Sequence, residues 1–376
     1  MKALVVVLSI LASTAFSAEP ARKDVLRLAA KAADWQLAHL DGAYVTHQTE
    51  ESRDPRSWEQ GAFYVGLTHL ADVSGEKRFR AAILSMGRSN QWQLGQRTYH
   101  ADDHVIGQSY LWAATHGAGP EAIAPLKATF DAILAKPPVV HLSFYIPPSG
   151  YGDTACLARW CWCDALFMAP PAWLELAKQT GDRRYANYAL AEFWSATAFL
   201  FDPAEELYFR DSRFFERRDE RGRKLFWSRG NGWVFAGLAN MLDALPADDP
   251  NRVGIEKLFR GMAQKIKSLQ KADGYWAPSL LGPENSPPEA SGTGFHVYGL
   301  AWGVNHGLLD AIEYRPSILS GWQALARSVA KDGRVGWVQQ VSDRPETVNE
   351  ADTQFYGVGA FLLAASAVAQ LKPVVY

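Results

Sequence analysis

The sequence has no marked excess of charge of either sign. Its 376 residues include 38 Lys and Arg against 40 Asp and Glu, which gives a formal net charge of −2. A protein that binds nucleic acid or an anionic membrane surface usually gathers basic residues on one face, and no such basic cluster is present. After its first residues the chain also lacks an apolar run long enough to span a membrane. The composition therefore argues against nucleic acid and membranes as partners.

Linkers rich in proline, glycine or serine are missing as well, and no run of like charges divides the chain. Length alone would suggest two or three domains. Because 48% of the residues are apolar and no break separates them, we predict one large domain over residues 19–376. We expect this domain to be a monomer or a weak homo-oligomer.

Cysteine is scarce, and the three that occur cluster at Cys156, Cys161 and Cys163. In an oxidising compartment one pair could close a small loop and leave one thiol over; the alternative is three buried thiols. No histidine accompanies them at a spacing typical of a zinc site. We therefore expect neither a metal nor another cofactor.

The first 18 residues have the pattern of a secretory signal peptide. Lys2 is followed by a short apolar run and then by small residues near Ser17 and Ala18, where we expect cleavage. The run is too short for a stable membrane span. We therefore predict export to the periplasm or the medium.

The rest of the chain contains about a dozen helical patterns separated by turn residues. They cover residues 22–37, 58–73, 79–87, 104–115, 121–135, 164–180, 184–200, 230–245, 252–270, 294–309, 317–331 and 355–371. The stretches beginning at Leu67 and Leu174 share a helix end, a glycine stop and a basic-aromatic restart, which is typical of a helix-hairpin corner. Hairpins can stack as an open solenoid or close into a ring. Because the loops differ widely in length and hold most of the unusual residues, we predict an all-α fold, an (α/α)6 barrel with a pocket at one mouth.

One carboxylate stands among large apolar side chains in the stretch R-W-C-W-C-D-A-L-F-M-A-P-P, which begins at Arg159. Burial beside tryptophan and methionine raises the pKa of a carboxyl such as Asp164. A carboxyl that holds its proton near neutral pH can act as a general acid. The alternative is that Asp164 only caps the helix that opens at Ala165.

A second acidic pair, Asp102 and Asp103, lies in the motif A-D-D-H just before a predicted helix. Both carboxylates are well placed to interact with the positive end of the helix dipole, so the pair could simply cap the helix. The functional interpretation is that one of them caps while the other turns inward as a partner of Asp164.

The motif F-W-S-R-G-N-G-W is the most specific in the chain. Arg229 lies between Trp227 and Trp233, and its planar guanidinium suits a carboxylate while the indole rings can stack on a sugar. Asn231 could hydrogen-bond a hydroxyl group. The alternative is that Arg229 pairs with one of the site aspartates. Fourteen tryptophans in all fit sugar stacking, but they also fit helix interfaces.

Further candidates for substrate binding precede or open other predicted helices. The motif P-E-A-S-G-T-G-F-H offers Glu289, Ser291 and His296, although a lone histidine on an apolar helix is more often a core residue. Trp58 opens an earlier helix in the same manner. Asp211 adds a charge in an aromatic loop.

In this order, the motifs W-C-D-A-L-F-M-A-P-P, T-G-D-R-R-Y, F-W-S-R-G-N-G-W and P-E-A-S-G-T-G-F resemble glycoside hydrolase family 105. These enzymes are unsaturated rhamnogalacturonyl hydrolases and related unsaturated uronyl hydrolases. The similarity also touches A-D-D-H-V-I-G-Q and Y-G-V-G-A-F-L-L-A and spans nearly all of the mature chain. It implies an (α/α)6 barrel without a metal.

The resemblance also implies a reaction on the C4=C5 double bond that polysaccharide lyases leave at a non-reducing end. Family members protonate C4 and add water at C5, and the hemiketal then opens and releases the neighbouring sugar. By resemblance, Asp164 is the proton donor that also activates the water, and Asp102, or its neighbour Asp103, is the second carboxylate. Trp227, Arg229 and Trp233 match the substrate-binding segment.

Three other functions are compatible with these residues. A conventional glycosidase on the same barrel would use Asp102 or Asp103 with Asp164 as acid and base on saturated sugars. A non-catalytic carbohydrate-binding scaffold would use the tryptophans alone. A polysaccharide lyase would require a tyrosine or histidine base near an arginine.

Overall fold

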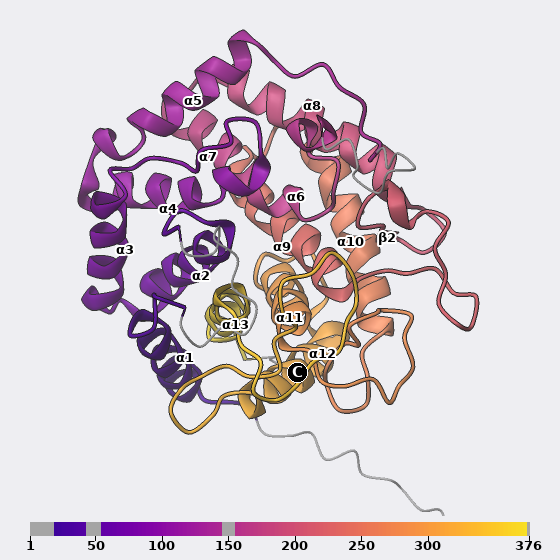
Figure 1. Cartoon of the computed structure of the whole chain (residues 1–376). Coiled ribbons are helices and arrows are strands. Elements are labelled where there is room, and N and C mark those ends of the chain that lie inside the picture. The colour runs from indigo at the N-terminus through magenta and orange to yellow at the C-terminus, as the bar shows by residue number, and fades with distance from the viewer. Residues whose placement is uncertain (1–18, 43–53, 145–154, 374–376) are drawn as a thin grey trace, which may run out of the picture.

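The computed structural model describes residues 19–42, 54–144 and 155–373, which form two concentric layers of helices (Figure 1). The predicted signal peptide lies outside these residues. The outer layer consists of α1 (Arg22–Leu37), α3 (Lys77–Ser89), α5 (Ala124–Ala135), α8 (Arg183–Leu200), α10 (Arg252–Ser268) and α12 (Ala311–Arg327). The inner layer consists of α2 (Trp58–Ser74), α4 (Ile106–Ala113), α7 (Pro170–Thr180), α9 (Ser228–Ala244), α11 (Ala290–Asn305) and α13 (Phe355–Val368). Each outer helix is followed by an inner one, so the chain builds six hairpins.

The sequence pattern separates the two layers. In the outer helix α10 the buried residues are Ile255, Phe259, Met262, Ala263 and Ile266, a single stripe at helical spacing. In the inner helix α13 every residue is buried, because the helix is covered by neighbours on all sides. A one-sided apolar stripe therefore marks the outer wall, and an apolar surface all round marks the core.

The ring is closed. Each inner helix contacts the next, from α2 through α4, α7, α9 and α11 to α13, and α13 returns to contact α2. At this last seam Gly66 of α2 faces Gly359 of α13. A Cβ atom on Gly66 would lie 2.4 Å from the Gly359 carbonyl oxygen, and one on Gly359 would lie 2.4 Å from the Ala62 oxygen. The predicted (α/α)6 barrel is confirmed.

Several helix boundaries differ from the sequence prediction; α11, for example, runs over Ala290–Asn305 and not over 294–309. The segment expected to run over 164–180 is split into α6 (Ala165–Met168) and α7, because Pro170 and Pro171 supply no backbone N–H to continue the first helix. The helix expected at 104–115 is preceded by a 3₁₀ turn, η2 (Ala101–His104), and ends in a π turn, η3 (Ala114–Ala118). Helix α12 begins at Ala311 and continues through Pro316, which the pattern had placed before its start.

The connections at the two ends of the ring differ in length. Gly75 and Gly181 end α2 and α7 in the left-handed conformation, which confirms the hairpin corners expected from the repeat. The opposite rim carries longer connections, including the two-stranded β1 (Phe201–Asp202) and β2 (Leu207–Tyr208). It also carries the short turns η5 (Ala155–Arg159) and η6 (Ser212–Phe214), whereas η4 (Pro120–Ala122), between α4 and α5, lies at the same end as Gly75 and Gly181. No helix among the described residues is long and apolar enough to cross a membrane.

Candidate active site

A cavity of about 340 Å³ lies where the N-terminal ends of α2, α6 and α9 meet the loop before α13. This volume is at the lower end of the range for small-molecule sites, about 300 to 1,000 Å³. Four tryptophans, three aspartates and two arginines dominate its chemistry. The lining residues are Trp58, Asp102, Trp162, Asp164, Met168, Arg210, Trp227, Arg229, Trp233, Val341, Ser342 and Asp343.

Asp164 is the most buried carboxylate of the cavity wall, with only 7% of the residue exposed. It precedes α6 but makes no capping hydrogen bond, so the capping alternative does not hold. Its Oδ2 lies 3.3 Å from Nε of Arg210 and accepts a weak contact from the thiol of Cys163 at 3.8 Å. Burial raises the pKa of Asp164, and the charges of Arg210 and Arg229 offset this only in part. The side chain therefore has the environment of a general acid.

The acidic pair divides, but only in part as the functional interpretation predicted: one carboxylate lines the cavity, and neither acts as a cap. Asp102 lines the cavity, whereas Asp103 points away and is held by Arg97, whose Nη2 lies 2.6 Å from its Oδ1. Asp103 therefore supports the turn, and Asp102 is the second carboxylate of the site. Neither caps the turn, since that position belongs to His100. Burial and nearby positive charges lower the pKa of His100 to about 3, so its 3.7 Å contact with Asp102 is not an ion pair at neutral pH.

Arg229 lines the cavity but is only 1% exposed, and its terminal nitrogens are used in hydrogen bonds within the protein. Its Nη1 and Nη2 donate to the carbonyl oxygens of Gln339 and Gln340 at 2.7 and 2.9 Å. Its flat faces are covered by Trp227 and Tyr356, with the guanidinium carbon 4.4 and 4.6 Å from the two ring centroids. Arg229 makes no ion pair with a site aspartate among the described residues, so it anchors the loop that carries Val341, Ser342 and Asp343 into the site.

The aromatic wall of the cavity is fixed by contacts behind it. The ring of Trp58 stacks on Tyr356 with centroids 5.0 Å apart, and its edge meets Trp233 at 6.3 Å. Trp227 donates its indole N–H to the side-chain oxygen of Gln339 at 3.1 Å. These rings are held rigidly, which suits them to pack against a sugar ring. The predicted positions of Trp58, Trp227 and Trp233 in the site agree with the structure.

Asn231 does not line the cavity, contrary to our expectation. Its Oδ1 accepts from the backbone N–H of Tyr208 at 2.7 Å, and its Nδ2 donates to the Tyr208 and Trp227 carbonyls. The amide thus joins strand β2 to the start of α9 and has no donor or acceptor left for a substrate.

Glu289, Ser291 and His296 also lie behind the cavity wall. Glu289 caps α11 by accepting hydrogen bonds from the backbone N–H groups of Ser291 and Gly292, and it also accepts one from the Ser291 hydroxyl. The imidazole of His296 contacts the Ser228 hydroxyl at 3.1 Å, and burial lowers its pKa to about 3. All three residues stabilise the junction of α9 and α11, where a polar side chain before a helix acts as a cap.

Asp211 is fully buried and forms ion pairs with two neighbouring arginines. It lies 2.7 Å from Nη1 of Arg210 and 2.7 Å from Nη2 of Arg213. Burial would raise the pKa of Asp211, but hydrogen bonds and charge from the two guanidinium groups hold it below its usual range. Asp211 therefore orients Arg210, which does line the cavity.

Sequence reasoning missed half of the lining residues. Trp162 and Met168 were treated only as the apolar surroundings of Asp164, although their proximity to it was a usable signal. Arg210 directly precedes Asp211 but was not itself predicted as a site residue. Val341, Ser342 and Asp343 come from a loop without a motif, and only tertiary contacts bring this loop to the site.

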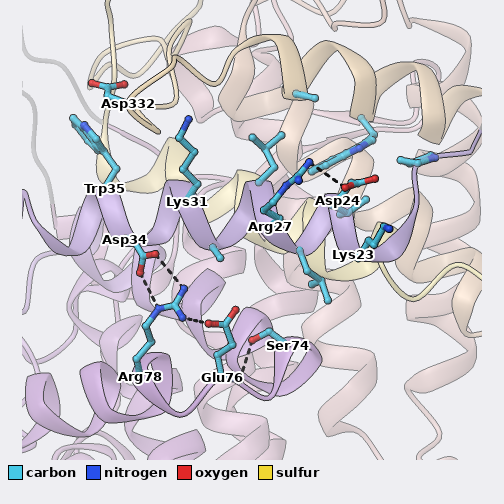
Figure 2. Close-up of a pocket in the computed structure, with 17 residues that line it drawn as sticks. Lys23, Asp24, Arg27, Lys31, Asp34, Trp35, Ser74, Glu76, Arg78 and Asp332 are labelled. Atoms are coloured by element: carbon cyan, nitrogen blue, oxygen red, sulfur yellow. Dashed lines mark hydrogen bonds and ion pairs between the residues drawn. The ribbon is translucent and has the colours of Figure 1, made fainter.

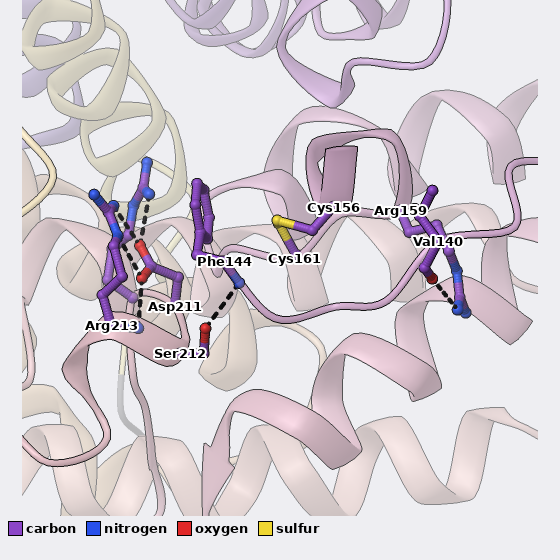
Figure 3. The surroundings of a disulfide bond; sticks show 9 residues. Val140, Phe144, Cys156, Arg159, Cys161, Asp211, Ser212 and Arg213 are labelled. Atoms are coloured by element: carbon purple, nitrogen blue, oxygen red, sulfur yellow. Dashed lines mark hydrogen bonds and ion pairs between the residues drawn. A yellow bond between two sulfur atoms is a disulfide. The ribbon is translucent and has the colours of Figure 1, made fainter. Parts of the chain in front are cut away.

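A disulfide between Cys156 and Cys161 lies directly before Trp162 and Asp164 (Figure 3). This resolves the two alternatives for the cysteines: one pair is bonded and Cys163 remains a buried thiol. Figure 3 places Phe144 on one side of the disulfide, where its backbone N–H donates to the Ser212 hydroxyl at 2.9 Å. The crosslink therefore tightens the segment that delivers the acid to the cavity.

A larger hollow of about 1,090 Å³ lies on the outer wall around α1 (Figure 2). Its charged residues divide over two sides of the helix, with Asp34 and Arg78 on one side and Lys31 and Asp332 on the other. Arg78 is paired with Asp34 at 3.0 Å and with Glu76, so its charge is already matched. This is an open surface around a helix, and it lacks the converging carboxylates of the cavity at the rim.

The described residues contain no group of three or more His, Cys, Asp or Glu side chains arranged to hold a metal ion. The chemistry that this cavity offers is proton transfer by Asp164, with Asp102 as the second carboxylate and a rigid aromatic wall for a ring-shaped substrate.

Comparisons with known proteins agree with this chemistry. The sequence model of Glycosyl Hydrolase Family 88 matches residues 28–372. The chain is 42% identical over 349 residues to an unsaturated 3S-rhamnoglycuronyl hydrolase from Alteromonas sp. (strain LOR), covering 90% of this chain and 84% of that protein. It is 38% identical over 351 residues to a protein of the same name from Formosa agariphila, covering 91% and 89%.

Solved structures share the fold. A glycosyl hydrolase family 88 protein from Bacteroides vulgatus superposes with a TM-score of 0.80 at 26% identity, over 94% of this chain and 100% of the other. A possible member of family GH105 from Salmonella enterica has a TM-score of 0.75 at 17% identity, over 97% and 99%. The resemblance to unsaturated uronyl hydrolases inferred from the motifs is confirmed, and the chain is a glycoside hydrolase that belongs to glycosyl hydrolase family 88.

Proposed function

We propose that this protein removes a 4,5-unsaturated uronic acid from the non-reducing end of oligosaccharides that a polysaccharide lyase has produced. The observation that carries the proposal is Asp164, a buried carboxyl of raised pKa in a cavity walled by tryptophan, with Asp102 in the same wall. The relatives named unsaturated 3S-rhamnoglycuronyl hydrolase support rhamnose as the sugar that follows the uronate.

The reaction needs one acid and one positioned water. Protonated Asp164 transfers its proton to C4 of the double bond, and the water oxygen bonds to C5 while the water proton returns to the Asp164 carboxylate. The resulting hemiketal opens and the neighbouring sugar leaves. A single carboxyl thus acts first as acid and then as base, and Asp102 is placed to orient the water or a substrate hydroxyl.

The test is a spectroscopic assay with unsaturated disaccharides prepared by a polysaccharide lyase. We expect the absorbance of the enol-ether double bond to fall with time, because hydration removes the double bond. A saturated disaccharide of the same sugars is the control and should remain intact. Cleavage of the saturated sugar alone would show a conventional glycosidase, a rise in absorbance would show a lyase, and tight binding without turnover would show a scaffold.

We further propose that the protein works outside the cytoplasm as a single catalytic domain. The pattern of residues 1–18 supports export, and a Cys156–Cys161 disulfide suits an oxidising compartment. Mass spectrometry of the protein expressed from its full sequence tests this proposal. We expect the chain recovered outside the cytoplasm to begin near residue 19 and to carry the disulfide.

A further inference from the structure

Arg210 stands at the edge of the cavity and is tied to the segment that carries the acid. Its carbonyl oxygen accepts a hydrogen bond from the backbone N–H of Cys163 at 2.8 Å, one residue before Asp164. Its side chain lines the cavity and remains 17% exposed. The guanidinium and the acid therefore share one rigid frame.

The two arginines of the cavity differ in what their nitrogen atoms contact. In Arg229 both terminal nitrogens are bonded to backbone carbonyls and both faces are covered by rings, which leaves only the buried Nε. In Arg210 only Nη1 is committed, to Asp211 at 2.7 Å. Its Nε makes no hydrogen bond beyond the 3.3 Å ion pair with Asp164, and its Nη2 makes none within the described residues. Because the Nε of Arg210 is buried like that of Arg229, Nη2 is the donor that Arg210 retains for a ligand.

Arg210 has two acidic partners, Asp164 at 3.3 Å and Asp211 at 2.7 Å. Asp211 is shared with Arg213, which is itself paired with Asp343 at 2.9 Å across the mouth of the cavity. In the proposed reaction Asp164 starts with its proton on and so carries no charge. The guanidinium of Arg210 then keeps only its shared contact with Asp211, and its Nη2 can donate to an anionic oxygen of the substrate in a site of low exposure.

We propose that Arg210 is a binding residue for an anionic oxygen group of the substrate. The group is either the carboxylate of the unsaturated uronate or a sulfate ester on the next sugar, both of which present paired oxygens to the guanidinium fork. In this arrangement the protonated acid and the bound anion occur together. The inference rests on the proposed function, since it concerns the same cavity and the same substrate class, and it gives Arg229 the role of loop anchor.

The test compares Arg210→Gln and Arg210→Lys with Arg217→Gln, an exposed arginine of the same loop that does not line the cavity. The substrates are a lyase-generated unsaturated disaccharide with a sulfated second sugar and the same disaccharide after desulfation. We expect Arg210→Gln to raise KM by about 10- to 100-fold, the effect of losing a hydrogen bond to a charged group. Arg210→Lys should recover part of this loss, and Arg217→Gln should leave KM unchanged.

The two substrates identify the anion. A raised KM for both assigns Arg210 to the uronate carboxylate, and a raised KM for the sulfated substrate alone assigns it to the sulfate. Two results would overturn the proposal. The first is an unchanged KM for both substrates, and the second is a fall in kcat with a shifted acidic limb of the pH–rate profile but no change in KM. Calorimetric binding of the same disaccharides to Asp164→Asn, with and without Arg210→Gln, repeats the comparison without turnover. A wild-type enzyme that hydrates neither substrate would refute the proposed function separately.

Discussion

Replacing Asp164 with asparagine should abolish activity and stabilise the fold at the same time. Asparagine has nearly the shape of the carboxyl but cannot donate a proton to C4 or take one from water. General acid and general base assistance each contribute about 10² to 10⁴-fold to a rate. Since one group performs both steps, we expect kcat to fall at least about a thousandfold, with KM changed little.

The stability of the same variant follows from the sign of the pKa shift. Burial raises the pKa of Asp164 in the folded protein, even with Arg210 at 3.3 Å. A carboxyl whose folded pKa is raised destabilises the fold at every pH where it is ionised, because the unfolded chain ionises it more easily. A neutral amide avoids this cost. We expect a gain of about 0.5 to 2 kcal/mol at neutral pH, the range of single stabilising substitutions.

Urea unfolding of both proteins between acidic and neutral pH measures this difference. The gain should shrink as the pH falls through the raised folded pKa and should vanish below the ordinary carboxyl pKa of 3.8, where Asp164 is protonated in both states. If the ion pair with Arg210 dominated instead, Asp164→Asn would destabilise the protein by about 3 to 5 kcal/mol. That outcome, or substantial activity of the variant, would refute the assignment of Asp164 as a buried general acid.

Three further predictions concern the framework of the site. Arg229→Lys should lower the free energy of unfolding in urea by about 2 kcal/mol and raise KM. An ammonium group cannot donate to two successive carbonyls while lying flat between two rings. A normal KM would mean that the position of the loop does not depend on Arg229. Gly359→Ala should cost about 1 to 3 kcal/mol, since its Cβ would lie 2.4 Å from the Ala62 oxygen, and an unchanged Tm would contradict the close seam. Replacing both Cys156 and Cys161 with serine should lower the free energy of unfolding by about 2 kcal/mol, the loop-closure contribution of a crosslink over so few residues. A fall in kcat of the folded variant would show that the crosslink also positions the acid.

The sequence predicted the architecture well because each helix carries its own signal. Inner helices are apolar all round, outer helices have one stripe, and glycines such as Gly75 and Gly181 mark the corners. Boundaries were less certain where proline stands inside a segment. Pro316 lies within α12, whereas Pro170 separates α6 from α7, and local sequence alone does not distinguish the two outcomes.

The site was predicted in part, and the errors share one cause. Asp164, Asp102 and the tryptophans Trp58, Trp227 and Trp233 line one cavity, and their roles in the reaction stay predictions. Asn231 and Glu289 lie in equally unusual motifs, but their side chains turn back to bond backbone N–H groups. A polar residue before a helix can face the cavity or cap the helix, and the choice depends on long-range packing that a single sequence does not display.

The stack of Trp58 on Tyr356 joins residues from opposite ends of the chain. The aromatic wall of the cavity is complete only when α13 supplies Tyr356 behind Trp58. A chain that ends before α13 can therefore form helices but lacks a complete binding site. Such non-local contacts also slow folding. The same seam restricts hydrolysis to the completed molecule, in which α13 has closed the ring.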